Sequence, residues 1–130
     1  MGLITMDGQQ IQTLALKTAL SLPETTLTQP FGEGCDVVKV MDKVFLLSTH
    51  YQQQALVNLK CDPIHADELK MLYPSIRAGY HMNKKHWISV YAGEHIDALL
   101  IEDLVKNSYD LVVDKLGKVK RLRIQLLSKY

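Results

Sequence analysis

The densest group of side chains that could do chemistry lies in one short stretch, residues 77–87. It combines three fixed positive charges with two histidines, two aromatic rings and an amide, and it lacks carboxylates; its members are Arg77, Tyr80, His81, Asn83, Lys84, Lys85, His86 and Trp87. Cations neutralise phosphates, rings stack on bases or sugars, and an amide can hydrogen-bond a base edge, so the stretch points to nucleic acid. A solvated turn before a strand, with merely exposed lysines, has the same composition, and for Trp87 alone we favour a role as a core anchor.

The other histidines and the cysteines give weak signals for catalysis or metal binding. No two of the five histidines have the i, i+4 spacing with a carboxylate that a helical zinc motif needs. Cys35 and Cys61 are not a CxxC pair, and neither has a histidine beside it, so we expect both to be reduced and at least partly buried. The sequence also contains no phosphate-binding loop and no serine-nucleophile motif. We therefore expect no catalytic residue, no metal and no cofactor.

Length and composition indicate one globular domain. A chain of 130 residues is in the usual range for a single core, and an apolar fraction of 47% with a charged fraction of 22% argues against disorder. The apolar runs are far shorter than the roughly 20 residues of a membrane span, and the N-terminus does not resemble a secretory signal. We expect a cytoplasmic protein without a membrane-embedded part.

The net charge of +1 hides an uneven distribution. From Lys115 onward there are six basic residues and no acidic ones, whereas the preceding 114 residues hold nine basic and fourteen acidic side chains, a net charge of −5. A basic tail of this kind can bind nucleic acid or a membrane, or it can fold back on the acidic body. Both interpretations stay open. We treat residues 1–117 as a single domain and residues 118–130 as a basic C-terminal extension.

Apolar residues at helical spacing, with capping residues before them, predict three helices. The first helix should start after Thr5 or Asp7 and end before Pro23. The second should start at Asp62-Pro63 and end before Pro74, and the third should start after Asp97 and end at Gly117. Residues 118–130 fit a strand as well as a helix, and we favour a helix.

β-Branched and apolar runs predict strands at residues 25–31, 37–41, 44–48, 55–60 and 87–91. The second and third should form a hairpin around Asp42-Lys43, and the fourth alternates so that one of its faces should be solvated. The order is therefore α-β-β-β-β-α-β-α. Grouped strands with flanking helices are typical of an α+β fold, with helices covering one side of an antiparallel sheet.

The stretch from Tyr80 to Val90, read together with Ser108-Tyr109, resembles the MmcQ/YjbR family, whose pattern is His-Leu-Asn-Lys-x-His-Trp-x-Thr-Val followed by a helix carrying Ser-Tyr. Residues 38–45 are similar to the family's Lys-Val-x-x-Lys-x-Phe hairpin, and residues 57–63 to its strand-to-helix junction. The chain departs from the family after the tryptophan strand, where residues 92–97 lack the frequent Asp-Gly-x-x-Pro turn, and in its longer basic tail.

The resemblance implies a double-wing fold and a predicted DNA-binding role, without a cofactor or a reaction. We therefore expect a non-catalytic DNA-binding protein that contacts mainly phosphates. Its phosphate-holding residues would be Arg77, Lys60, Lys84 and Lys85, and the surface would be shaped by His81, Asn83, His86 and Trp87.

Two other functions remain open. A protein- or peptide-binding module would use the same surface, and the acidic balance of the body favours it. A small-molecule binder or enzyme would use His81, His86, Tyr91 and Cys61 in a pocket with a shifted pKa.

Overall fold

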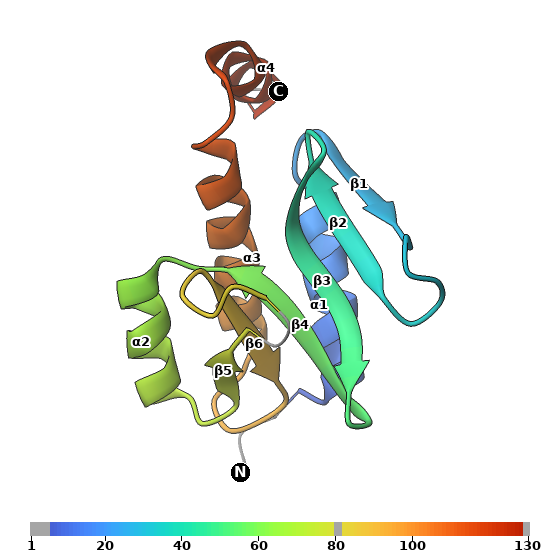
Figure 1. The fold of residues 1–130 in the computed structure, drawn as a ribbon, viewed down its shortest axis with the longest axis vertical. Coiled ribbons are helices and arrows are strands. Elements are labelled where there is room, and N and C mark those ends of the chain that lie inside the picture. The colour runs from blue at the N-terminus through green and yellow to red at the C-terminus, as the bar shows by residue number, and fades with distance from the viewer. Residues whose placement is uncertain (1–5, 80–81, 129–130) are drawn as a thin grey trace.

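The computed structural model describes residues 6–79 and 82–128 as one six-stranded sheet with four helices (Figure 1). In chain order the elements are α1 (Gly8–Leu20), β1 (Thr25–Thr28), β2 (Asp36–Val40), β3 (Lys43–Tyr51), β4 (Gln54–Lys60), α2 (Pro63–Leu72), β5 (Ile76–Ala78), β6 (Trp87–Tyr91), α3 (Ala98–Val113) and α4 (Lys118–Ser128). The α+β class and the predicted order are confirmed, and α4 is the helix favoured for the tail. The structure adds β5, which at three residues is too short for an alternating pattern to reveal it.

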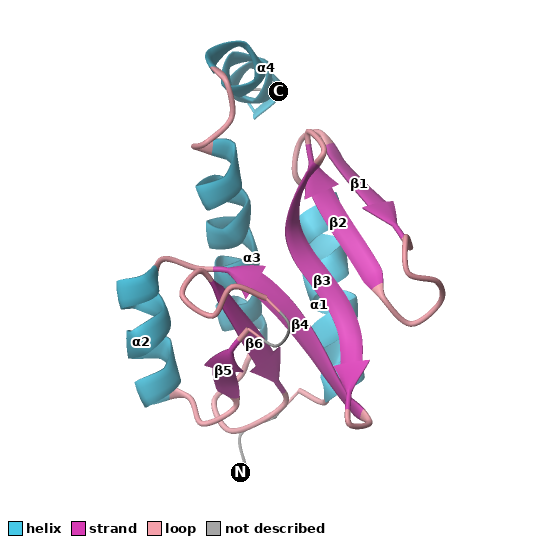
Figure 2. Ribbon diagram, viewed as in Figure 1, coloured by secondary structure: helices cyan, strands magenta, loops and turns pink. Residues whose placement is uncertain are grey.

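The strands form one open sheet in the order β1-β2-β3-β4-β6-β5, and all neighbours are antiparallel. α1 and α3 pack against one face, which we call the back, and Figure 2 shows both behind the strands. α2 lies beside β5, and α4 lies beyond the end of α3. The other face, which we call the front, is crossed by the loop between β5 and β6 (Figure 1). Because α1 and α3 cover the back, the front is the face on which a ligand could reach the sheet.

Three aspartates start the three main helices: Asp62 and Asp97 as predicted, and Asp7 as one of the two caps predicted for the first helix. Each carboxylate accepts a hydrogen bond from a backbone N–H of the first turn, at 2.8 Å for Asp7, 3.2 Å for Asp62 and 2.9 Å for Asp97. These bonds satisfy N–H groups that have no partner within the helix. The helix starts could be predicted because the capping contacts are local in sequence.

The predicted end of the third helix at Gly117 is wrong. α3 ends at Val113, and the Lys115 N–H donates to the Val112 carbonyl at 3.1 Å in a tight final turn. Carbonyls at the helix end are satisfied in this way without a left-handed glycine. Gly117 belongs to the start of α4, where its carbonyl accepts the Arg121 N–H at 3.1 Å.

Two-residue turns join β2 to β3 and β3 to β4. Met41 and Asp42 have φ values of 48° and 68° in the first turn, and Gln52 and Gln53 have values of 50° and 66° in the second. Paired positive φ values are what two-residue hairpins require to match the twist of the sheet. The first turn therefore lies one residue before the predicted position, and Lys43 is the first residue of β3.

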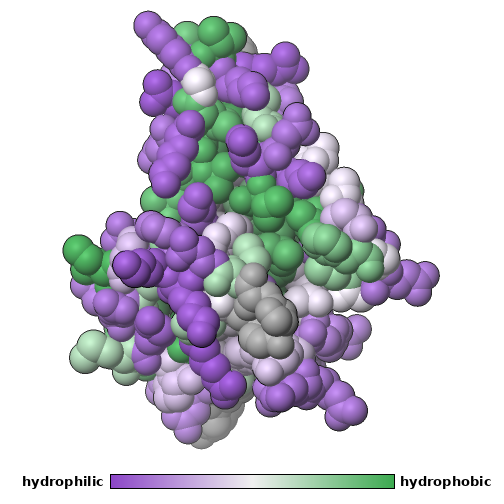
Figure 3. Space-filling model, in the orientation of Figure 1, coloured by the Kyte–Doolittle hydropathy of each residue, from purple (hydrophilic) through white to green (hydrophobic). Residues whose placement is uncertain are grey.

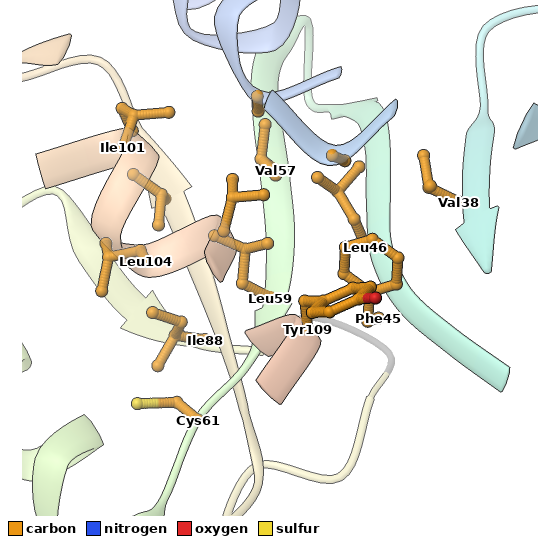
Figure 4. Packing of buried hydrophobic residues seen from close by; sticks show 14 of the residues in the cluster. Val38, Phe45, Leu46, Val57, Leu59, Cys61, Ile88, Ile101, Leu104 and Tyr109 are labelled. Atoms are coloured by element: carbon orange, nitrogen blue, oxygen red, sulfur yellow. The ribbon is translucent and has the colours of Figure 1, made fainter. Parts of the chain in front are cut away.

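Side chains from the back of the sheet pack with α1 and α3 into one hydrophobic core (Figure 4). Its members include Val38, Phe45, Leu46, Val57, Leu59, Ile88, Ile101, Leu104 and Tyr109. The prediction that one face of residues 55–60 is solvated is wrong, because Leu56 and Asn58 on the front are 1% and 3% exposed. β4 lies in the middle of the sheet, and the β5–β6 loop brings Met82 to the same cavity wall as Asn58. The adjacent strands and the β5–β6 loop therefore shield the front of β4 from solvent.

Ser108 of α3 joins β3 and β4 where their pairing stops. The last register pair at this end is Leu46 with Leu59. One residue further, the buried Ser108 hydroxyl donates to the Phe45 carbonyl at 2.5 Å and accepts the Lys60 backbone N–H at 2.8 Å. These two backbone groups would face each other if the pairing continued, and the hydroxyl satisfies both. The strands can therefore part here, as Figure 1 shows, without leaving a buried polar group unpaired.

Replacing Ser108 with alanine should destabilise the fold, because the Phe45 carbonyl and the Lys60 N–H would lose their partner. Each buried unsatisfied group costs about 1–3 kcal/mol, so we expect the free energy of unfolding to fall by about 2–4 kcal/mol in urea denaturation. Ser128→Ala is the matched control, since it removes an exposed hydroxyl that bonds the Ile124 carbonyl within α4. A loss no larger than the control's would show that β3 and β4 close up and pair directly.

Candidate nucleic-acid interface

Three of the predicted site residues lie on the front of the sheet: Arg77 on β5, Trp87 on β6 and Lys60 at the end of β4. Side chains alternate along a strand, and Ile88 belongs to the core behind the sheet, so Trp87 points forward. Lys60 is the register partner of Trp87, which makes them direct neighbours on this face. Trp87 is half-buried and lies outside the core, so the role of core anchor favoured for it is wrong.

Arg77 is held in place by an aromatic ring. Its guanidinium carbon lies 4.9 Å from the centroid of the Tyr91 ring, within the range of a cation–π contact. Tyr91 itself is buried, and beside it Ser89 donates a hydrogen bond to the Asn58 side-chain oxygen at 2.5 Å, which ties β6 to β4. The front therefore offers a positioned guanidinium on an ordered sheet.

The remaining predicted residues belong to the β5–β6 loop. Asn83, Lys84 and Lys85 are exposed and His86 is half-buried, whereas His81 lies outside the described residues. The Asn83 side-chain oxygen accepts the Lys85 backbone N–H at 3.0 Å, so the amide expected to hydrogen-bond a base edge takes part in a local turn. The two lysines are thus displayed at the surface by a turn that stabilises itself.

Backbone hydrogen bonds fix both ends of this loop. At its start the Gly79 N–H donates to the Trp87 carbonyl at 2.9 Å, and at its end the Cys61 N–H donates to the His86 carbonyl at 2.8 Å. A Cβ atom at residue 79 would lie 2.6 Å from the Cβ of Trp87, so the close approach requires glycine. The loop is therefore anchored to β6 and to the segment between β4 and α2.

A second group of cations lies where β3 and β4 part. Lys43, Lys60 and Lys115 line a pocket of about 320 Å³, whose other lining residues are Val44, Val112 and Leu116. We call it the three-lysine pocket. Lys60 was predicted as a site residue from the sequence, whereas Lys43 and Lys115, which are far apart in the chain, were not. Two features of the sequence could have indicated this pocket: Lys115 stands at the start of the basic tail, and Lys60 stands at the end of a predicted strand.

The positive charge of this pocket is not compensated. Burial lowers the pKa of Lys60, and the charge of Lys115 lowers it further. In the part of the chain that the structure describes, none of the three lysines forms an ion pair with a carboxylate, and the same holds for Arg77, Lys84 and Lys85.

Residues 118–128 of the basic tail form α4, which begins beside the three-lysine pocket. Lys118 and Lys120 line an adjoining cavity of about 430 Å³ that shares two lysines with the pocket. Ile124 is buried, and Arg123 Nε lies 3.1 Å from a Glu24 carboxylate oxygen, so α4 is held against the body. One basic residue of the tail thus folds back on an acidic side chain, while Lys118 and Lys120 stay exposed.

An apolar groove of about 680 Å³ adjoins the pocket on the front of the sheet. Phe31, Val37, Val44, Leu47 and Met82 contribute to its walls, and Val44 is shared with the three-lysine pocket. Figure 3 shows apolar surface in the middle of this face with hydrophilic residues around it. The Phe31 side chain is 76% exposed, which is unusual for a residue of this size and type. The apolar hollow on the front thus adjoins a basic hollow that lies between β3, β4 and the end of α3.

Two of the residues expected of a small-molecule pocket or enzyme, Cys61 and Tyr91, lie on opposite faces of the sheet, and a third, His81, lies outside the described residues. Cys61 belongs to the core behind the sheet (Figure 4), whereas Tyr91 lies on the front. Burial and the charge of Asp62 raise the pKa of the Cys61 thiol to about 11, so it is protonated and a poor nucleophile at neutral pH. Tyr91 lines a cavity with His50, not with His86.

Other kinds of site can be checked within residues 6–79 and 82–128. In these two ranges no three His, Cys, Asp or Glu side chains are arranged so that they could hold a metal ion. Of the helices described, none has the length and apolar character needed to cross a membrane. The prominent features of the surface are its unpaired cations and the apolar groove.

Comparison with known proteins decides the family. The model of the YjbR family matches residues 20–111, which include Lys43, Lys60, the β5–β6 loop and Ser108. The chain belongs to the YjbR family. The resemblance read from the sequence is thereby confirmed. Of the residues that line the three-lysine pocket, Lys43, Val44 and Lys60 lie inside the matched range, and Val112, Lys115 and Leu116 lie just beyond it.

Relatives of this YjbR-family protein share most of its length. The uncharacterized protein YbdF of Escherichia coli O157:H7 is 46% identical over 120 residues, 92% of this chain and 98% of that protein. The uncharacterized protein YjbR of Escherichia coli K12 is 33% identical over 90 residues, 68% of this chain and 76% of that protein. Their names state no activity, so the function must be argued from the site.

Two crystal structures have a similar fold. Deinococcus radiodurans protein DR2400, with a DUF419 domain, has a TM-score of 0.74 and 31% identity, covering 92% of this chain and 88% of that one. A Pseudomonas syringae protein has a TM-score of 0.63 and 24% identity, covering 82% of this chain and 98% of that one, and shows a likeness of fold alone.

Gly79→Ala should displace the β5–β6 loop, because the added methyl group would overlap Trp87. We expect a loss of about 1–3 kcal/mol in the free energy of unfolding and a changed fluorescence spectrum of Trp87, the single tryptophan of the chain. Gly117→Ala is the matched control, since a Cβ there meets open space and should change neither quantity. Equal behaviour of the two variants would mean that the loop is not held by this contact.

Proposed function

We propose that this YjbR-family protein binds DNA in the cytoplasm through its phosphates and catalyses no reaction on it. The observation that carries the proposal is a set of cations without carboxylate partners in the described chain. Arg77, Lys84 and Lys85 belong to β5 and the loop that follows it, and the other members line the three-lysine pocket. Unpaired cations on an accessible surface attract a polyanion, and release of its counterions drives binding.

The distribution of charge between the two faces supports this proposal. α3, on the back, carries Glu102, Asp103 and Asp110 against one lysine, Lys106. Part of the acidic excess of residues 1–114 therefore lies on the far side of the sheet. None of these carboxylates lines the three-lysine pocket, although the same helix contributes Val112 to it.

The ordered side chains of the front suit phosphate contacts with little base readout. The positioned Arg77 guanidinium can donate two parallel hydrogen bonds to a phosphate. Trp87 beside Lys60 offers a ring for a sugar or a base. Asn83 uses its side-chain oxygen within its own loop, which favours backbone contacts over sequence reading. The double-wing arrangement expected from the family resemblance is compatible with this mode.

Titration of labelled duplex DNA should give a dissociation constant below about 10⁻⁴ M at low salt, and the affinity should fall steeply as salt is added. If four phosphates are neutralised, raising the salt from about 50 to about 200 mM should weaken binding roughly 100-fold. Lys84→Glu/Lys85→Glu should weaken binding further and reduce the slope of log K against log salt by about 2.

Lys17→Glu/Lys106→Glu is the matched control for this charge reversal. It makes the same change in net charge at exposed positions of α1 and α3, behind the sheet. It should leave the slope unchanged. An equal effect of both variants would mean that only net charge matters, and a dissociation constant above about 10⁻⁴ M for the wild type at low salt would remove the proposal.

The apolar groove favours a second candidate function, the binding of a protein segment. Phe31, Leu47 and Met82 provide apolar surface that DNA phosphates would not use. A partner strand or helix could bury its own apolar side chains there, and the acidic balance of residues 1–114 is compatible with such a partner.

Selection from a random peptide library would test this second function. Wild-type protein should enrich peptides with apolar anchor residues, and Leu47→Arg, which places a charge in the groove, should not bind them. Leu47 is half-buried at the surface, so the fold of the variant can be verified by circular dichroism. Failure to enrich any peptide, or binding that Leu47→Arg retains, would exclude the groove as a peptide site.

A further inference from the structure

The three-lysine pocket differs from a flat basic surface because its lysines surround a hollow. Lys43 comes from the start of β3, Lys60 from the end of β4, and Lys115 from the turn after α3. Three elements thus converge on one cavity of about 320 Å³. A continuous DNA backbone that passes over a surface needs no such cavity. A hollow of this kind suits a group that projects from its carrier and can enter.

The walls of the pocket strengthen the interactions of Lys60, which is half-buried, whereas Lys43 and Lys115 are exposed at the rim. Val44, Val112 and Leu116 are apolar and cannot replace the water that solvates an ammonium group. Lys60 is already half-buried, and both this burial and the charge of Lys115 lower its pKa. Charges in partly dry surroundings interact more strongly than in water. A compact anion with two negative charges would therefore relieve more repulsion here than an anion with one.

The adjoining cavity provides a path for the rest of such a ligand. It shares Lys43 and Lys115 with the pocket and extends to Lys118 and Lys120 at the start of α4. Within the part of the chain that the structure describes, no carboxylate lines either hollow. A chain that places one anionic group in the pocket can therefore place its next anionic group over the adjoining cavity.

We propose that the three-lysine pocket binds a phosphate monoester dianion, carried by the end of a DNA strand, with the next phosphate over the adjoining cavity. A terminal phosphate bears close to two negative charges at neutral pH, whereas an internal phosphodiester bears one. The choice of DNA as the carrier rests on the function proposed above. The preference for a doubly charged group rests on the pocket alone.

Three labelled oligonucleotides, identical except at the 5′ end, would test the proposal. They carry a hydroxyl, a phosphate or a methyl phosphate, so the last has the same phosphate with one charge fewer. The phosphorylated strand should bind about 10-fold more tightly than the other two, the size of effect expected of charge-assisted hydrogen bonds.

Variants identify the pocket as the source of this preference. Lys60→Gln and Lys115→Gln should each bring the phosphorylated strand to the affinity of the hydroxyl strand. Lys106→Gln, an exposed lysine of α3 behind the sheet, should keep the difference. Thermal unfolding checks that all three variants are folded. A preference that survives both pocket substitutions would overturn the assignment to this pocket.

The outcomes separate this inference from the proposed function. Equal affinity for all three strands would overturn the inference and leave DNA binding in place.

If no strand binds, the proposed function fails, and the pocket is then tested with adenosine 5′-monophosphate and inorganic phosphate, each followed by NMR titration. The result would support a monoester site with a free phosphorylated compound as its ligand if three conditions hold: the binding is saturable, Lys60→Gln abolishes it, and adenosine does not bind. Absence of that binding would overturn the inference as well.

Discussion

The Ser108 hydroxyl lies between the Phe45 carbonyl and the Lys60 backbone N–H, and its two hydrogen bonds span the place where β3 and β4 part. Without this hydroxyl, the strands would have to continue pairing or leave two buried polar groups unsatisfied, at about 1–3 kcal/mol each. With it, the sheet splits beyond the pair of Leu46 and Leu59. Lys60 then stands at the edge of a gap, and the three-lysine pocket lies in that gap. The basic hollow between β3, β4 and the end of α3 thus depends on one buried side chain of α3.

The residue after Ser108 fixes the same region from a second direction. The Tyr109 hydroxyl donates to the Pro23 carbonyl at 2.8 Å, and its ring meets Phe45 edge-on, with centroids 5.4 Å apart. Burial, and after it the charge of Asp110, raise the pKa of Tyr109 to about 12, so the hydroxyl keeps the proton that it donates. α3 therefore locks β3 from behind and also holds the link between α1 and β1. In this structure the Ser-Tyr pair of the family pattern positions strands, and it lies away from the surface where we propose binding.

Local chemistry was readable from the sequence, and long-range geometry was not. The caps at Asp7 and Asp97 contact amides a few residues away, so the starts of their helices could be predicted from the local sequence. Lys43 looked like part of a hairpin, and Lys115 like the start of a tail, because nothing in their neighbourhoods reveals the split that brings them near Lys60. Trp87 was misjudged for a similar reason, since its side of the sheet follows from its register with β4. The front of β4 was expected to be solvated because polar and apolar residues alternate along the strand. That pattern carries no information about a loop, later in the chain, that covers this face.

The acidic balance of residues 1–114 seems to oppose DNA binding, yet the lining of the pocket and screening weaken that objection. None of the carboxylates of α3 (Glu102, Asp103 and Asp110) lines the three-lysine pocket or the adjoining cavity, although Val112 of the same helix lines the pocket. The Debye length at 0.1 M ionic strength is about 10 Å, and interactions between exposed charges fade beyond it. The lysines of the pocket would contact a bound phosphate directly, within hydrogen-bond reach. What an anion experiences on the front is therefore set by the local, unpaired cations and only weakly by the net charge of the body.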